Sequence, residues 1–213
     1  MNALQSIMQN KLVAVIRKVK DSDVISIGES LLKGGIRVFE ITADSPDFLK
    51  SIELVKSEFG KDVTVGAGTV LDSITAKSAI NAGAEFIFAP TTSLETIKLT
   101  KRYGVVSIPG AMTPTEILTA YENGADLIKV FPANVLGPKY LSDIRGPLQH
   151  IPLMPTGGVN IGNVQDYFNN GAVAAGLGNS LVNTNVVIDQ DELNSIEERA
   201  KHFVSKINEL HFQ

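Results

Sequence analysis

One lysine of this chain lies in an apolar segment, and its amine is the first candidate for covalent chemistry. Lys129 is surrounded by apolar residues in Leu127–Pro132 (LIKVFP). Burial disfavours the charged ammonium and lowers the pKa of a lysine from about 10.4. A neutral amine is the form that attacks a carbonyl carbon. The alternative is a structural lysine whose charge is paired with Glu40 or another carboxylate.

A weak internal repeat relates Lys129 to Glu40. Four segments open with glycine followed by isoleucine or alanine, and the fifth residue after each opening glycine is Glu40, Phe88, Lys129 and Gly176 in turn. Because side chains alternate faces along a strand, equivalent positions point in similar directions. Glu40 is therefore expected to face Lys129, where its carboxylate would move protons during addition to a carbonyl. The alternative is a strand-end glutamate that only caps or forms an ion pair.

Arg17 and Thr69 follow two other predicted strands and indicate contacts with an anionic group. Arg17 directly follows residues 13–16 (VAVI), and Thr69 follows residues 66–68 (GAG). A guanidinium at a strand end grips a carboxylate or phosphate through two parallel hydrogen bonds, and Thr69 adds a hydroxyl. The alternative for Arg17 is an ordinary surface arginine.

Two glycine-containing segments near the C-terminal end of the chain predict a phosphate site. Thr156 precedes Gly157 and Gly158, and Gly178 lies two residues before Ser180. Glycine lets backbone N–H groups approach a phosphate, and the loops after the last two strands of a (β/α)8 barrel commonly bind one. The alternative is that both segments are tight turns that need a positive φ.

These side chains need a framework of strands to bring them together. Apolar runs that read as strands are Lys11–Ile16, Arg37–Ile41, Val63–Ala67, Phe86–Ala89, Val105–Ile108, Leu127–Val130, Leu153–Pro155 and Val173–Leu177. Helix-length segments between them include Val24–Lys33, Asp47–Phe59, Ser73–Ala82, Leu94–Tyr103 and Thr115–Glu122. Repeated βα units predict an α/β fold, a (β/α)8 TIM barrel with an N-terminal helix, whose functional groups lie at the C-terminal strand ends. An open doubly wound sheet is the alternative, but no G-x-G-x-x-G follows the first strand.

Capping residues mark the ends of these helices. Thr113–Glu116 (TPTE) predicts a capping box with proline in the first turn, and residues 45–46 (SP) predict another helix start. Helices are expected to end in left-handed glycines at Gly34, Gly60, Gly83, Gly104, Gly124 and Gly171. Apolar residues at helical spacing predict a last packed helix over Leu193–Leu210. Because no linker or low-complexity run is found, residues 1–213 are expected to form one domain.

The composition of the 213 residues limits the classes of function. A net charge of -4 argues against a nucleic-acid partner. The absence of cysteine excludes disulfides, thiolate metal sites and cysteine nucleophiles, and the three histidines lack metal-ligand spacing. No metal or cofactor is therefore expected. No signal peptide or membrane-length apolar run is recognised, so we expect a soluble, cytoplasmic protein with no membrane partner.

Taken together and in order, five segments resemble the 2-keto-3-deoxy-6-phosphogluconate (KDPG) aldolase family, which includes 4-hydroxy-2-oxoglutarate aldolases. The resemblance runs from about residue 8 to 206, and its segments are residues 13–17 (VAVIR), 40–42 (EIT), 66–70 (GAGTV), 128–132 (IKVFP) and 155–159 (PTGGV). It implies a class I aldolase, a homotrimer of barrels and no metal.

The resemblance also implies a role for each candidate residue. Lys129 would form the Schiff base and Glu40 would act as acid and base. The implied substrate-binding residues are Arg17 and Thr69 near the pyruvate carboxylate, Phe131 as an aromatic wall, Thr156 near the substrate hydroxyls, and Gly157, Gly158, Gly178 and Ser180 in the loops near the phosphate.

The reaction implied is cleavage of KDPG to pyruvate and glyceraldehyde 3-phosphate, with cleavage of 4-hydroxy-2-oxoglutarate to pyruvate and glyoxylate as a second activity. One alternative is the 6-phosphogalactonate epimer as substrate. Another is a phosphosugar isomerase or epimerase, which would need an acid/base pair and no covalent lysine. A third is a barrel that only binds a sugar phosphate as a sensor.

One position departs from the family pattern. Some members carry an arginine four residues after the glutamate, where it binds the pyruvate carboxylate, and this chain has Asp44 there. An aspartate would repel that carboxylate, so we expect Asp44 to help cap the next helix. Residues 45–47 (SPD) resemble the galactonate branch, whereas Thr156 resembles the gluconate branch. The two cues leave the epimer open.

Overall fold

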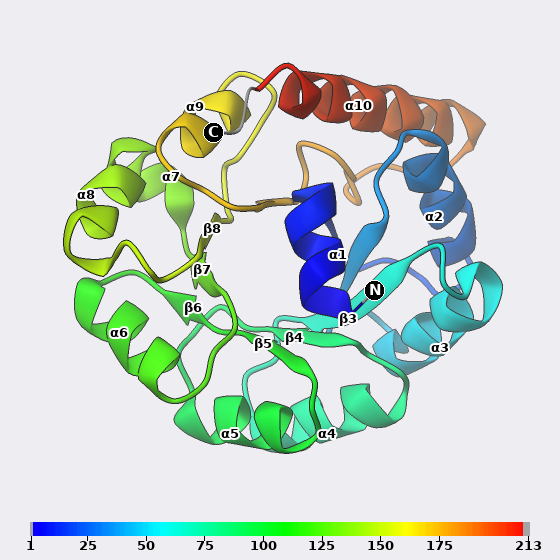
Figure 1. Cartoon of the computed structure of the whole chain (residues 1–213). Coiled ribbons are helices and arrows are strands. Elements are labelled where there is room, and N and C mark those ends of the chain that lie inside the picture. The colour runs from blue at the N-terminus through cyan, green and yellow to red at the C-terminus, as the bar shows by residue number, and fades with distance from the viewer. Residues whose placement is uncertain (1, 211–213) are drawn as a thin grey trace.

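Parallel strands line the centre of the molecule and helices surround them (Figure 1). The computed structural model describes residues 2–210. The strands are β1 (Leu12–Ile16), β2 (Val38–Thr42), β3 (Thr64–Gly68), β4 (Phe86–Phe88), β5 (Val106–Ile108), β6 (Gly110–Ala111), β7 (Ile128–Val130), β8 (Leu153–Pro155) and β9 (Ala175–Leu177). All the expected strands are present, with ends shifted by at most two residues, and β6 is additional.

The strands form two curled parallel sheets. One sheet has the order β5-β4-β3-β2-β1-β9 and the other the order β6-β7-β8. Pro109 separates β5 from β6 in the chain, and proline has no N–H to donate to a ladder. At the other junction a parallel bridge joins Thr156 to Gly176, and the Val173 N–H donates to the Leu153 carbonyl at 3.0 Å. The structure is therefore an α/β fold with a curled parallel arrangement, and it matches the expected barrel in part.

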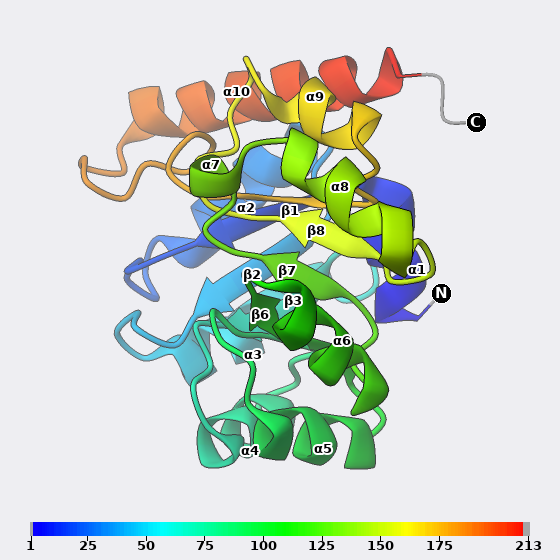
Figure 2. The same ribbon diagram turned by 90° about the vertical axis from the view of Figure 1, so that its left-hand side faces the viewer.

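Helices cover the outer side of this arrangement (Figure 2). They are α1 (Ala3–Asn10), α2 (Val24–Lys33), α3 (Phe48–Phe59), α4 (Ser73–Asn81), α5 (Leu94–Arg102), α6 (Pro114–Glu122), α7 (Ala133–Leu136), α8 (Lys139–Leu148), α9 (Val164–Asn169) and α10 (Gln190–Asn208). The expected helices are all present, and α1 is the N-terminal helix. The sequence does not predict α7 and α9, which are too short for a periodic pattern, or α8, which contains Pro147.

The capping predictions are largely confirmed. The Thr113 hydroxyl accepts from the Glu116 N–H, and the Glu116 carboxylate accepts from the Thr113 N–H, as in a capping box. The expected left-handed glycines are present except at Gly34, whose φ is -76°. The left-handed residue there is Gly35, with φ +92°, because Gly34 keeps a right-handed helical conformation as the C-cap of α2, which ends at Lys33 as predicted.

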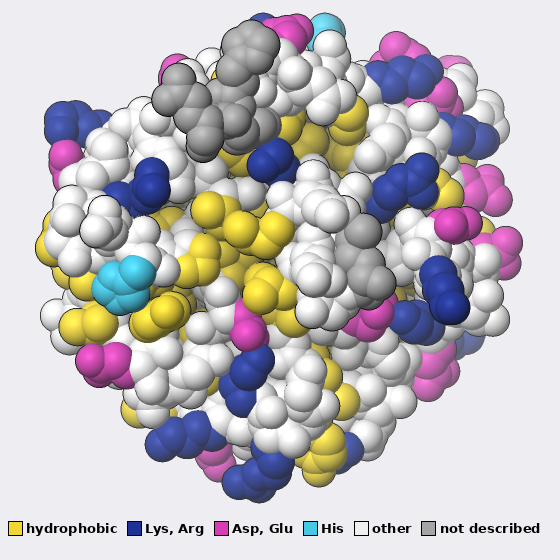
Figure 3. Space-filling view, viewed as in Figure 1, with side chains coloured by type: hydrophobic (Ala, Val, Ile, Leu, Met, Phe, Trp, Pro, Cys, Tyr) yellow, Lys and Arg dark blue, Asp and Glu magenta, His cyan; other side chains and the backbone are white. Residues whose placement is uncertain are grey.

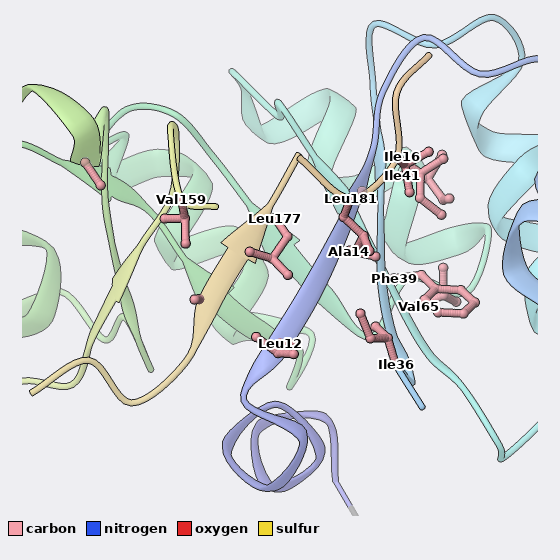
Figure 4. Packing of buried hydrophobic residues seen from close by; sticks show 14 of the residues in the cluster. Leu12, Ala14, Ile16, Ile36, Phe39, Ile41, Val65, Val159, Leu177 and Leu181 are labelled. Carbon is pink, nitrogen blue, oxygen red and sulfur yellow. The ribbon is translucent and has the colours of Figure 1, made fainter. Parts of the chain in front are cut away.

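Alternation along the strands sorts side chains between two hydrophobic clusters. On β1, Leu12 and Ala14 pack in the cluster that includes the helices, close to β9 (Figure 4). Val13 and Val15 belong to a second cluster, enclosed by the strands, which also holds Phe88 of β4. We call the enclosed side of the strands the inner face. The period of two therefore decides which side chains this face receives.

Helix α1 lies across the N-terminal ends of the strands and closes the inner face there (Figure 1). Ala3 and Ile7 belong to the enclosed cluster, and the Thr64 hydroxyl donates to the Ser6 hydroxyl at 2.8 Å. Further hydrophobic side chains gather beside this helix on the same side of the molecule (Figure 3). The site must therefore open at the opposite end, where the strands finish.

Over the described residues, none of the helices has the length and apolar character needed to traverse a lipid bilayer.

Removal of the Ile7 side chain tests this closure. Ile7 is fully buried, so we expect Ile7→Ala to lower the free energy of unfolding by about 3 kcal/mol, because the truncation leaves a cavity. The measurement is urea unfolding, with Met8→Ala as the control, since Met8 is 36% exposed on the same helix. Equal effects of the two substitutions would contradict the packing of α1 against the inner face.

Candidate active site

A cavity of about 530 Å³ opens where the strands end. Its lining residues come from the ends of β1, β7, β8 and β9 and are Val15, Arg17, Lys129, Phe131, Thr156, Gly157, Gly158, Val159, Asn160, Gly178, Asn179 and Ser180. Among the residues predicted from sequence, only Glu40 and Thr69 are outside this lining. Another cavity, of about 300 Å³, lies between the start of β1 and α10 and holds none of the predicted residues.

Lys129 is buried on the inner face and reaches the cavity. Its neighbours Ile128 and Val130 pack in the cluster that includes the helices, so alternation along β7 turns the Lys129 side chain to the inner face. The residue is 3% exposed. Its Nζ lies 4.2 Å from the ring centroid of Phe88 and 4.7 Å from that of Phe131. Within residues 2–210 its Nζ makes neither a salt bridge nor a hydrogen bond with a carboxylate. The structural ion pair considered above is therefore wrong.

Glu40 is fully buried on β2, next to the site. Among the described residues neither carboxylate oxygen has a hydrogen-bond partner. The side chain lies directly over Gly68 of β3, where a Cβ would come within 1.7 Å of Oε1. Gly68 is thus the residue that leaves room for this carboxylate.

Burial dominates the titration of both groups. Burial raises the pKa of Glu40 to about 7, against the opposing effects of the Lys129 and Arg17 charges. Burial likewise lowers the pKa of Lys129, and the charge of Glu40 opposes that shift. A lysine with a lowered pKa beside a carboxylic acid that titrates near neutral pH is a pair suited to imine chemistry.

Arg17 is held by two neighbours at the mouth of the site. Its Nη1 donates to Asp44 Oδ2 at 2.8 Å and its Nη2 donates to Thr69 Oγ1 at 3.1 Å. The expectation that Asp44 caps α3 is wrong, because the residue at that cap is Asp47 and Asp44 is paired with Arg17. β1 and β2 are paired with Ile16 opposite Ile41, which brings these strand ends together.

Thr156 is aimed at the cavity from the end of β8. Its hydroxyl oxygen is buried and has no hydrogen-bond partner in the described chain. Its side chain packs over Gly176 of β9, where a Cβ would come within 2.5 Å of Oγ1. The absence of a side chain at position 176 therefore decides the orientation of Thr156.

The two glycine-containing segments form the far wall of the cavity. Gly157 and Gly158 have positive φ values of 91° and 75°. A Cβ at Gly158 would lie 2.3 Å from Cβ of Asn134, so both conformation and space require glycine there. The Ser180 hydroxyl donates to the Val159 carbonyl at 2.7 Å, which ties the two loops together.

Sequence reasoning missed several residues of the site. Val15, Val159, Asn160 and Asn179 line the cavity, but the sequence assigned none of them a role. Val15 and Val159 lie within the segments 13–17 and 155–159 that carry the family resemblance. Phe88 contacts the lysine nitrogen, and the internal repeat had placed it at the position equivalent to Lys129 without assigning it a role.

In the part of the chain that the structure describes, no group of three or more His, Cys, Asp or Glu side chains is arranged to hold a metal ion.

Comparison with known proteins identifies close similarity to one enzyme family. The family model for KDPG and KHG aldolases matches residues 4–199. The chain is 34% identical to a probable 2-dehydro-3-deoxy-6-phosphogalactonate aldolase from Rhizobium meliloti, over 82% of each chain. It is 35% identical to a 2-dehydro-3-deoxy-phosphogluconate aldolase from Pseudomonas aeruginosa, over 74% of this chain and 71% of the other.

Solved structures agree with these sequence relatives. The structure of a KDPG aldolase from Legionella pneumophila, with pyruvate captured at low pH as a covalent carbinolamine intermediate, superposes with a TM-score of 0.86 at 27% identity. The match covers 94% of this chain and 97% of that chain.

The raised pKa of Glu40 makes a prediction about stability. A carboxyl whose pKa is higher in the folded than in the unfolded chain binds more protons when folded, so its contribution to stability falls as pH rises from 4.5 through 7. We expect wild type to lose about 3 kcal/mol relative to Glu40→Gln over this interval. The measurement is denaturant unfolding of both proteins at each pH. A difference that does not change with pH would contradict the shift, and Glu53→Gln, on the exposed side of α3, is the control.

Proposed function

The chain belongs to the KDPG and KHG aldolase family and is an aldolase, a carbon–carbon lyase, and from this premise we propose that it acts through a Schiff base on Lys129. The proposed substrate is KDPG, cleaved to pyruvate and glyceraldehyde 3-phosphate. Cleavage of 4-hydroxy-2-oxoglutarate to pyruvate and glyoxylate is a proposed second activity. The observation that carries the proposal is the buried lysine Lys129, which lines the cavity and forms no salt bridge with a carboxylate in the described residues.

The first half of the proposed reaction builds the imine. Neutral Lys129 attacks the C2 carbonyl carbon, and the resulting carbinolamine loses its hydroxyl as water after gaining a proton. Burial supports this step because it lowers the pKa of Lys129 and so increases the fraction of neutral amine. The product is a protonated imine, whose positive nitrogen accepts electrons from the next bond to break.

Glu40 is proposed to move protons in the second half. Its carboxylate takes the proton of the C4 hydroxyl, the C3–C4 bond breaks, and the bonding electrons pass to the imine as an enamine. The protonated Glu40 then returns a proton to C3, and hydrolysis releases pyruvate. A pKa of about 7 supports both roles, since acid and base forms coexist near neutral pH.

Polar groups around the cavity supply the proposed substrate contacts. Arg17 and Thr69, joined by a hydrogen bond, would bind the pyruvate carboxylate. The free Thr156 hydroxyl would meet a substrate hydroxyl. The phosphate would lie among backbone N–H groups of residues 157–158, which are left-handed glycines, and of residues 178–180.

The galactonate epimer is the second candidate substrate. The segment 45–47 (SPD) favours it, as do two curated relatives that are named 6-phosphogalactonate aldolases. Thr156 before Gly157 and Gly158, which resembles the gluconate branch, favours the gluconate epimer. A panel of both phosphates and 4-hydroxy-2-oxoglutarate, compared by kcat/KM, distinguishes them.

A closed barrel, a single domain and a trimeric assembly are also proposed for this protein. We propose that β5 and β6 are one strand interrupted at Pro109, and that the Thr156–Gly176 bridge completes a (β/α)8 barrel. A single domain over residues 1–213, a homotrimer and a cytoplasmic location are proposed from the sequence and its family resemblance.

Substitution of Lys129 tests the proposed chemistry. We expect Lys129→Ala to lower kcat for KDPG cleavage by at least about 10³-fold, because no other group supplies the covalent amine. Pyruvate release, coupled to lactate dehydrogenase, is the readout. Lys139→Ala is the control, since Lys139 is an exposed residue that pairs with Asp143.

Three outcomes distinguish the alternatives. Ordinary turnover by Lys129→Ala would exclude imine chemistry at this site. A wild-type protein that interconverts phosphosugars without releasing pyruvate would be an isomerase. A wild-type protein that binds the phosphates without any turnover would be a sensor.

Asp44 makes a separate prediction about substrate affinity. Its carboxylate accepts the hydrogen bond of Arg17 Nη1, so a substrate carboxylate must compete for this N–H group. The pair is partly exposed, which makes the competition modest. We expect Asp44→Asn to lower KM for KDPG about threefold with kcat little changed. Asp47→Asn is the matched control, and a raised KM in Asp44→Asn would show instead that Asp44 is needed to hold Arg17.

A further inference from the structure

The nitrogen of Lys129 lies against two aromatic rings. The Phe88 centroid, at 4.2 Å, is the closer one, and the Phe131 centroid is at 4.7 Å. Phe131 also lines the cavity, whereas Phe88 is fully buried on β4 and has no part in the function proposed above. Both distances are within the range over which a ring face attracts a cation.

We propose that Phe88 contacts the reacting nitrogen and, together with Phe131, stabilises the cationic imine formed on Lys129. The inference rests on the proposed Schiff-base function, and it adds a specific residue and a specific step. The step is dehydration of the neutral carbinolamine: its hydroxyl takes a proton from the acid form of Glu40, the C–O bond breaks as water leaves, and the nitrogen lone pair forms the C=N bond, so the nitrogen becomes positive.

Among the described residues, no carboxylate forms a salt bridge with the nitrogen of Lys129. Glu40 on β2 faces it but forms no salt bridge with it in the described chain, and near neutral pH part of the Glu40 population is protonated. Arg17, directly after β1, is itself a cation, and Asp44 is already paired with Arg17. The ring faces are therefore the groups in direct contact that favour the charged nitrogen over the neutral one.

Phe86 provides a matched comparison on the same strand. It is two residues from Phe88, fully buried, and also turned to the inner face. Its ring packs over Gly66 of β3, where a Cβ at position 66 would come within 2.4 Å of Cδ2 and Cγ. In the described chain the rings that contact Lys129 Nζ are those of Phe88 and Phe131. A change at Phe86 therefore reports the effect of altering a buried ring without altering the lysine contact.

The experiment replaces Phe88 by a ring-trifluorinated phenylalanine in the full chain. This residue keeps the shape of the ring and weakens the negative charge of its face, so the fold is retained. The first readout is the pKa of Lys129, followed by NMR of 13Cε-labelled lysine and assigned with Lys129→Arg. The second is the apparent affinity for pyruvate as a borohydride-trapped imine.

Both readouts have an expected direction. Weakening the ring face removes support for the charged form, so the pKa of Lys129 falls by about half a unit. The pyruvate imine becomes about threefold weaker for the same reason. Phe88→Leu shifts both quantities in the same direction, and the same trifluorinated residue at Phe86 leaves both unchanged.

Two results would overturn the inference, and they differ from each other. If wild type forms the pyruvate imine and fluorination of Phe88 changes neither readout, the ring contact is unimportant and the proposed function stands. If wild type forms no adduct at Lys129, the proposed function fails and the imine role fails with it. The lysine pKa comparison still shows in that case whether Phe88 attracts the amine.

Discussion

The chemistry of this site depends on one constraint, which is that Lys129 is buried without forming a salt bridge to a carboxylate of the described residues. A lysine in bulk water stays protonated, and a lysine in a tight ion pair is held charged. Here the lysine residue is 3% exposed and lines a cavity, and its Nζ lies against two aromatic rings. Glu40 is close enough to influence its pKa but forms no salt bridge with it in the described residues. The amine is therefore kept out of water and left available to a carbonyl.

Small residues opposite the functional side chains make this arrangement possible. The Glu40 carboxyl group occupies the space that a side chain at Gly68 would fill, and Thr156 does the same over Gly176. In both pairs the glycine lies on the neighbouring strand, at or near the paired position. The parallel pairing thus fixes where an acid and a hydroxyl lie in relation to the lysine.

The sequence predicted the inner face well because its signal is local. The period of two and the repeated opening glycine were enough to place Glu40, Phe88 and Lys129 on one side of the strands. Side-chain partners were harder, because they depend on which strand ends meet. Asp44 was expected at a helix cap, and the register that sets Ile16 opposite Ile41 brings it to Arg17 instead. The contact of Phe88 with Lys129 joins strands about forty residues apart, which no local pattern encodes.

The most direct measurement is borohydride reduction of the protein in the presence of pyruvate, followed by peptide mapping. A covalent amine at Lys129 predicts one pyruvate-derived adduct, located on the peptide that contains this lysine. An unmodified Lys129, or an adduct spread over exposed lysines such as Lys139, would contradict it.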